Sequence, residues 1–377
     1  MPKSKFKSYL INLAAAACVY LVFYLIFSNG LVSRTFIDLF TLCCIFSIAA
    51  VSLNLSTGLL GELNLGHAGF MSVGAYTSAL ITLSADSPGN IPILFVSLIA
   101  GGLMAALSGI VVGIPAFRLR GDYLAITTLA FGEIVKVIMR SMKITGGGQP
   151  LTGISLDTTY TMGYWVLIIT IIVIYTLIRS SHGRAILSIR EDDIASEACG
   201  VAVTRYKLIA FSLSAFFAGV AGGLYAHYQG VLEPSFFDYN QSINFMVMVV
   251  LGGIGSLTGS VISAFFLTLL PELLRGLAAY RTLIYSAVLI LLMLYRPEGL
   301  LGQKELSQRV IGNLFRRVKR EESPPSSGVG GSSVTPQENI PVSGSAERKA
   351  DSDLRERTGT SSGTPEEPLE RKWKGRR

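Results

Sequence analysis

Charged residues are scarce in this 377-residue chain: they make up 15% of it, against about 25% in soluble domains. Half of the residues are hydrophobic, and the mean hydropathy is +0.51. The charges avoid long apolar runs, which have the roughly 20-residue length that a helix needs to cross a bilayer. This composition excludes an ordinary soluble domain and indicates a polytopic membrane protein.

Cysteine is also rare, and its placement argues against the usual cysteine-based sites. The four cysteines are Cys18, Cys43, Cys44 and Cys199. Three of them lie in apolar segments and none forms a CxxC pair, so neither a disulfide framework nor a zinc site is predicted. His67 has no metal-ligating partner near it in the sequence, so we predict no metal site there either.

Known catalytic motifs are missing as well. The sequence contains no nucleophile elbow, HExxH motif or P-loop. The glycine-rich residues 145–150, TGGGQP, lack the Lys-Ser/Thr pair that completes a Walker loop. We therefore predict no catalytic residue and no cofactor bound by this chain. Any ATP-driven step would need a nucleotide-hydrolysing subunit other than this one.

The apolar segments predict an all-α polytopic membrane protein with about ten transmembrane helices. The transmembrane domain is expected to cover residues 1–302. Residues 303–320 could form an amphipathic helix on the membrane surface. Residues 321–377 are rich in Ser, Gly, Pro and charge, so a disordered tail is expected there. The expected membrane segments are 9–27, 36–55, 56–83, 93–117, 123–139, 165–178, 208–228, two half-length runs within 244–274, and 283–295.

Basic residues are distributed unevenly between the two sides of this arrangement. Up to residue 309, thirteen lie on the side of the N-terminus and five on the opposite side. The positive-inside rule then puts both termini in the cytoplasm. It also attributes the net charge of +7 to cytoplasmic loops, so no nucleic-acid partner is predicted.

Glycine interrupts the apolar pattern twice, near residues 56–76 and 252–260. These segments are the third and the eighth of ten, and an offset of five reverses the direction of the second half. That is the pattern of a 5+5 inverted repeat with a substrate route between its halves. The alternative is that the glycines only permit tight helix packing. The candidate route residues in these segments are Asn64, Gly66, His67, Gly69, Gly252, Gly253 and Gly255.

Polar side chains within apolar segments should face protein or a wet cavity, because lipid leaves them without partners. Asn64 and His67 are three residues apart, and Thr127, Thr128 and Glu133 lie in one later segment. All five are candidates for the route. His67 could equally be a packed, hydrogen-bonded histidine, and Glu133 could lie near the outer surface beside Arg140.

Residues 179–207 form the longest polar interval between the apolar segments. Its basic flanks predict a cytoplasmic position. Leu187, Ile194, Ala198 and Val201 recur at helical spacing, which predicts one short amphipathic helix, with Gly200 as its stop. The interval is either a simple connector or a helix that docks a soluble partner.

Six blocks in order give the chain a resemblance to a known family. They are GLLGELNLGHAGFMSVGAYTSAL, RLRGDYLAITTLAFGEIV, TGGGQPLTGI, SHGRAILSIREDDIASEACGV, LGGIGSLTGSVISA and RPEGLLG. Across residues 50 to about 302 the chain resembles the permease subunits of branched-chain amino acid ABC transporters, and the second block resembles the M-type of the two permeases.

The resemblance implies an inner-membrane subunit that pairs with a sister permease. Two ABC ATPase subunits would bind ATP and Mg²⁺ below it, and an external binding protein would deliver an amino acid. It also implies that residues 183–200 include the helix that couples to the ATPase. Ile194-Ala195-Ser196 stand where this loop has Glu-Ala-Ala, so only Ala195 and Gly200 match. The coupling candidates are Gly183, Arg184, Leu187, Arg190, Glu191, Ile194, Ala195, Ala198 and Gly200.

The function expected from the resemblance is ATP-driven import of branched-chain or related amino acids by alternating access within the lipid bilayer. Permeases for urea and short amides are related, so that substrate class is an alternative. A different class is a proton-coupled secondary transporter that uses Glu133 and His67. ATP dependence of transport separates the two classes.

Overall fold

The computed structural model describes residues 33–85, 89–119, 121–274, 281–295 and 299, with six N-terminal positions (17, 18, 20, 21, 24 and 25). The regular secondary structure of this part of the chain is helical, and its only β-type pairing is an isolated bridge between Leu151 and Leu232. The predictions for residues 303–320 and 321–377, and most of that for 9–27, lie outside the described residues.

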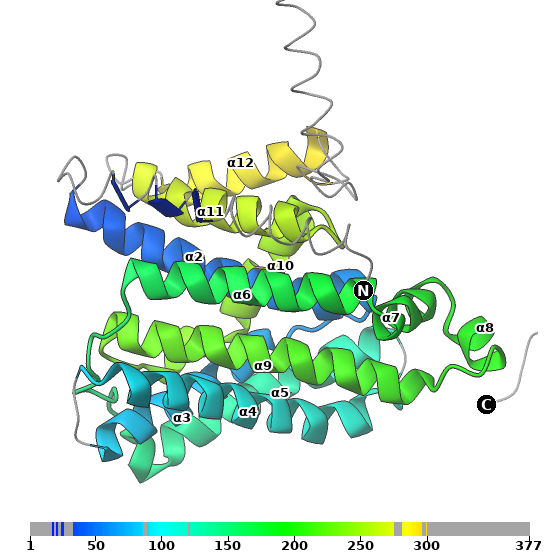
Figure 1. Cartoon of the computed structure of the whole chain (residues 1–377), viewed down its shortest axis with the longest axis horizontal. Helices are drawn as coiled ribbons and strands as arrows, with labels where there is room; N and C mark the ends of the chain where they lie inside the picture. Colours follow the sequence, from blue (N-terminus) through cyan, green and yellow to red (C-terminus); the bar gives the residue numbers. More distant parts are fainter. Residues whose placement is uncertain are drawn as a thin grey trace, which may run out of the picture. The chain divides into compact units, whose positions relative to one another are not determined.

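The helices follow the chain in the order shown in Figure 1. They are α2 (Arg34–Asn54), α3 (His67–Ser84), α4 (Ile91–Ala116), α5 (Asp122–Ser141), α6 (Tyr160–Arg179), α7 (Ser181–Glu191), α8 (Asp193–Ala198), α9 (Val203–Gln229), α10 (Tyr239–Gly252), α11 (Leu257–Leu273) and α12 (Arg281–Tyr295). Three short elements join them: the π-helical turn η1 (Leu55–Leu59) and the 3-10 turns η2 (Lys143–Thr145) and η3 (Pro234–Phe237).

Four helical segments of the described part are long and apolar enough to cross a membrane. They are Arg34–Leu59, Ile91–Ala116, Tyr160–Arg179 and Val203–Gln229. The all-helical membrane class predicted from the composition is therefore confirmed. The total of ten spans stays a prediction.

Both glycine-interrupted segments are breaks in the helical backbone. The first passes from η1 through non-helical backbone at residues 61–66 before α3 begins. The second is the turn 253–256, which separates α10 from α11 as the two half-length runs predicted. Gly253 and Gly255 have φ angles of +106° and +90°. Only glycine adopts such angles without strain, so these residues permit the turn.

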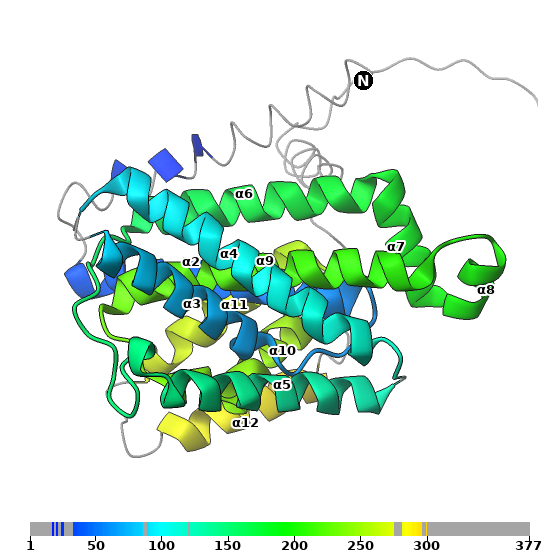
Figure 2. The ribbon, with the colours of Figure 1, turned by 90° about the horizontal axis from the view of Figure 1, so that it is seen from below.

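Helix α9 packs closely against α3 and α4, as Figure 2 shows. A Cβ at Gly222 would overlap the backbone carbonyl of Met71 in α3, and one at Gly219 would lie 2.9 Å from the carbonyl oxygen of Gly101 in α4. Small residues of α9 therefore lie where this helix crosses α3 and α4, and they permit the close approach of the backbones.

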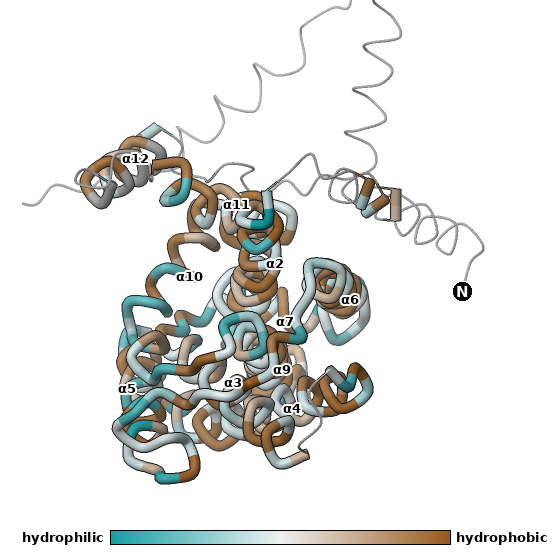
Figure 3. The backbone as a smooth tube through the Cα atoms, turned by 90° about the vertical axis from the view of Figure 1, so that its left-hand side faces the viewer, coloured by the Kyte–Doolittle hydropathy of each residue, from teal (hydrophilic) through white to brown (hydrophobic). Residues whose placement is uncertain are grey.

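The outer faces of α4 and α5 differ in chemistry. Helix α4 exposes apolar side chains along its length, which suits contact with lipid. Helix α5 mixes apolar and polar exposed residues, and hydrophilic positions are visible along it in Figure 3. The exposed large apolar residues of α4 are Ile91, Phe95, Val96, Ile99, Leu103, Met104, Leu107, Ile110, Val111 and Ile114.

Candidate functional site

The polar interval between α6 and α9 folds as two helices, so the prediction of a single helix is wrong. Ser180 Oγ accepts a hydrogen bond from the Gly183 amide at 3.1 Å, which caps α7. Asp192 Oδ1 then accepts from the amides of Ile194 and Ala195, both at 2.9 Å. An aspartate in this position begins a new helix, because it satisfies amides that have no partner within the helix.

Because the helix breaks at Asp192, the predicted apolar face does not form. Leu187 is half-buried in α7, whereas Ile194 is 64% exposed in α8 and Ala198 is exposed too. Val201 lies beyond the end of α8. The residues that the sequence placed on one helix face therefore belong to different elements, and only Ile194 and Ala198 share a helix.

The buried face of α7 was missed by sequence reasoning. It consists of Ile186 and Ile189, which pack with Leu60 and with Ala210 of α9. A Cβ at Gly183 would overlap the carbonyl groups at the end of α6, so glycine permits this contact. The spacing of three between Gly183, Ile186 and Ile189 was the available signal.

Helix α8 ends at Ala198, and the predicted stop residue Gly200 follows two positions later with a φ angle of +84°. Its amide donates to the carbonyl oxygen of Glu197 at 2.9 Å, and the Val201 amide donates to that of Ser196 at 3.0 Å. These bonds satisfy carbonyl groups at the end of the helix. The candidates that remain exposed at this end of the molecule are Arg184, Glu191, Ile194, Ala195, Ala198 and Gly200.

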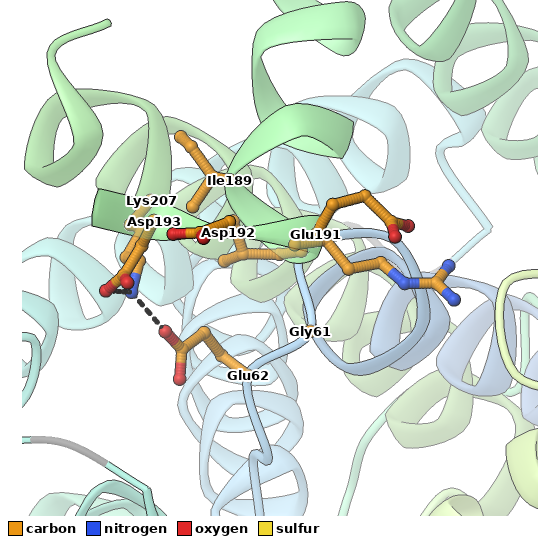
Figure 4. Close-up of a pocket in the computed structure, with 9 residues that line it drawn as sticks. Gly61, Glu62, Ile189, Glu191, Asp192, Asp193 and Lys207 are labelled. Atoms are coloured by element: carbon orange, nitrogen blue, oxygen red, sulfur yellow. Dashed lines mark hydrogen bonds and ion pairs between the residues drawn. The ribbon is translucent and has the colours of Figure 1, made fainter. Parts of the chain in front are cut away.

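Charged side chains connect the start of α9 to the first glycine-interrupted segment. Lys207 Nζ lies 2.5 Å from Glu62 Oε1 and 3.9 Å from Asp193 Oδ2. Figure 4 shows these residues around an open pocket of about 340 Å³. The pocket is lined by Leu60, Gly61, Glu62, Ile189, Arg190, Glu191, Asp192, Asp193 and Lys207.

His67 is fully buried and hydrogen-bonded at both ring nitrogens. Its Nε2 lies 2.9 Å from Ser52 Oγ and 3.1 Å from the carbonyl oxygen of Ala49. Its Nδ1 lies 3.5 Å from Asn64 Nδ2, and the ring meets Phe245 edge-on. These contacts support the packed alternative for His67 in this conformation. Its place on a substrate route stays a prediction.

The start of α3 and the residues just before it pack against α5. A Cβ at Gly66 would overlap the carbonyl oxygen of Thr128, and one at Gly69 would lie 2.8 Å from Gly132 Cα. Thr128 Oγ1 accepts a hydrogen bond from the Leu65 amide at 3.1 Å. Irregular backbone at membrane depth is tolerated where protein satisfies it, and α5 does so here.

Thr127 and Glu133 lie on the more exposed side of α5. Thr127 Oγ1 donates to the carbonyl oxygen of Tyr123 at 2.8 Å, within the helix. Glu133 forms an ion pair with Lys136, and its Oε1 accepts from the Tyr239 amide at 3.2 Å. The carboxylate therefore connects α5 to the start of α10.

Asn54, which sequence reasoning missed, connects the end of α2 to the second glycine-interrupted segment. Its Nδ2 donates to the carbonyl oxygen of Ser256 and to Ser260 Oγ, both at 2.9 Å. Its Oδ1 accepts from the Gly255 amide at 2.9 Å. A Cβ at Gly252 would overlap Gly259 of α11. An asparagine within the apolar segment 36–55 was the available signal, because such a group requires partners.

Two broken helical segments that meet in the core of a multi-pass bundle, beside a polar helical loop, define a membrane protein of the transporter class. The profile of the family described as "Branched-chain amino acid transport system / permease component" matches residues 35–295. The chain belongs to this family, which confirms the resemblance seen in the sequence.

Curated relatives agree with this assignment. The chain is 36% identical over 306 residues to the high-affinity branched-chain amino acid transport system permease protein LivM of Escherichia coli (strain K12). The aligned region covers 72% of this chain and 71% of that protein. It is 24% identical over 297 residues to the corresponding protein LivH of Salmonella typhimurium, with 71% and 94% covered. The higher identity to LivM agrees with the M-type resemblance. No solved structure matches the chain.

Proposed function

We propose that this chain is the M-type permease subunit of an ATP-driven importer for branched-chain or related amino acids. The observation that carries the proposal is the 36% identity to LivM over 72% of the chain. The family is one of transport permeases rather than enzymes. ATP and Mg²⁺ would bind to two separate ATPase subunits, and an external binding protein would supply the amino acid.

Helix α8 is the proposed contact with an ATPase subunit. It exposes Ile194, Ala195 and Ala198, while α7 is fastened to α6 and α9 by its buried face. A small apolar surface on a firmly held support suits insertion into a cleft on a partner. The acidic residues around it, Asp192, Asp193 and Glu197, would set the register of the contact.

Helix α5 is the proposed boundary with the sister permease and the substrate route. It exposes Tyr123 by 70% and Ile126 by 61%, yet it also carries the Glu133–Lys136 ion pair, which is about one-third exposed. Charged side chains that faced lipid would have a high free-energy cost, because they would lose their hydration. A protein partner or an aqueous route removes that cost, whereas the apolar face of α4 is suited to lipid.

The proposed membrane arrangement has ten spans, a 5+5 inverted repeat and both termini in the cytoplasm. Its support is the clustering of basic residues at one end of the bundle, together with α7 and α8. Those within the described residues are Arg118, Arg179, Arg184, Arg190, Arg205 and Lys207.

Two positions test this orientation with little disturbance. Cys199 is already exposed beside α8, and Gly148 has open space where a cysteine side chain would go. In a background without the other cysteines, we expect a membrane-impermeant maleimide to label Gly148→Cys in intact cells. We expect it to label Cys199 only after the membrane is opened. Labelling of Cys199 from outside would reverse the proposed topology.

The substrate class is tested by uptake into vesicles that contain the complete complex. Leucine uptake that isoleucine and valine inhibit would support the proposal. Uptake of urea or acetamide, unaffected by leucine, would favour the amide alternative instead.

A further inference from the structure

Arg190 belongs to the polar interval but does not point toward its exposed surface. The residue is half-buried, and its Nη1 donates to the carbonyl oxygen of Gly58 at 2.8 Å. A Cβ at Gly61 would lie 3.2 Å from Arg190 Cγ, so the side-chain stem runs along the chain just after η1. The Arg190 guanidinium, carried by α7, therefore contacts η1, the turn that continues α2.

The same guanidinium lies beside the second glycine-interrupted segment. A Cβ at Gly255 would be 3.1 Å from Arg190 Nη1, and one at Gly58 would overlap the Gly255 amide. The backbones of Gly58 and Gly255 thus meet directly, and Arg190 lies across their junction. Asn54 also contacts this turn, because its Oδ1 accepts a hydrogen bond from the Gly255 amide.

Charge pairing does not explain the position of Arg190. Among the described residues, the ion pairs beside the pocket of Figure 4 join Lys207 to Glu62 and to Asp193. Arg190 uses its Nη1 on a backbone carbonyl instead. A long side chain that ends in a planar, permanently charged group with several donors suits this reach across two backbones.

The junction is built from elements that can change conformation. A π-helical turn is uncommon and often marks a functional site, and a glycine turn absorbs large changes in backbone angles. A cavity of about 230 Å³ beside Arg190 leaves room for its side chain to move. The cavity is lined by Leu59, Tyr175, Ile178, Arg179, Leu187, Arg190, Ile254 and Gly255.

We propose that Arg190 is a positioning residue that links α7 to the junction of Gly58 and Gly255, so that movement of α7 changes the geometry of both glycine-interrupted segments. The proposal rests on the proposed function, in which an ATPase moves the α7–α8 loop. Helix α8 contacts the ATPase, and Arg190 transmits the resulting movement of α7 to the two glycine-interrupted segments.

The test compares transport with ATP hydrolysis in one preparation of vesicles that contain the complete complex. We expect Arg190→Gln to lower the amino acid transported per ATP about tenfold, the factor that corresponds to about 1.4 kcal/mol. This loss is of the size expected for a hydrogen bond made by a charged group. Arg190→Lys retains a charged donor, so we expect its ratio to lie closer to that of the unaltered protein.

Arg205→Gln is the matched control, because it removes an exposed arginine at the start of α9. We expect it to leave the ratio unchanged. A ratio for Arg190→Gln equal to the control would overturn the proposal. Equal losses of uptake and of ATP hydrolysis in Arg190→Gln would also overturn it, because they indicate a purely structural role. A transport-to-hydrolysis ratio for Arg190→Lys as low as that for Arg190→Gln would overturn it as well. A lack of ATP-dependent uptake in the unaltered complex would instead overturn the proposed function itself, and this inference with it.

Discussion

Replacing Gly66 with leucine is expected to lower uptake at least tenfold. The segment before α3 packs against α5 so closely that even a Cβ at Gly66 overlaps the backbone carbonyl of Thr128. Backbone cannot rotate aside as a side chain can, so α3 and α5 would have to separate. Overpacking of a core costs about 1–3 kcal/mol, and overlap with backbone belongs at the upper end.

The facing helix supplies a matched control for this substitution. A Cβ at Gly132 would lie 3.4 Å from Gly66 Cα, which is an ordinary contact. We therefore expect Gly132→Ala to transport nearly normally and Gly66→Ala to be impaired. Membrane insertion of all three variants should be unchanged. Normal uptake by Gly66→Leu would contradict the close packing of α3 on α5.

Replacing Ala198 with glutamate is expected to remove the ATPase from the purified complex. Ala198 is exposed on α8 beside Ile194 and Ala195, the surface proposed to enter a cleft on the ATPase. A charge buried there without a partner costs several kcal/mol, enough to lower affinity about a thousandfold. Substrate-stimulated ATP hydrolysis should disappear with the contact, while pairing with the sister permease persists.

Thr204→Glu is the control for this charge. Thr204 is exposed in the first turn of α9, where a glutamate interacts favourably with the helix dipole. We expect this variant to retain the ATPase. If Ala198→Glu also retains it and transports normally, α7 and α8 form only a connector.

Much of this fold could be predicted from the sequence, because span length and glycine interruptions are local properties. The turn 253–256 between two half-length helices and the stop at Gly200 are examples. The break at Asp192 was missed because helical spacing continues across it. It depends on a cap, and an aspartate followed by Asp193 and Ile194 was an available but overlooked sign of one.

The candidate site could be predicted only in part, because its decisive contacts are distant in sequence. His67 was recognised as a polar residue in need of partners, yet its partners on α2 decide how it is packed. Asn54 and Ser256 are 202 residues apart, and Arg190 and Gly58 are 132 apart. Spacing along the chain carries no information about such pairs.

We propose that the chain forms the membrane route of an ATP-driven importer. The most direct test is leucine uptake into vesicles that contain this chain, a sister permease, the two ATPase subunits and the external binding protein. We expect uptake that requires both ATP and the binding protein and that does not respond to a proton gradient. Uptake that a proton gradient drives without ATP would contradict the proposal.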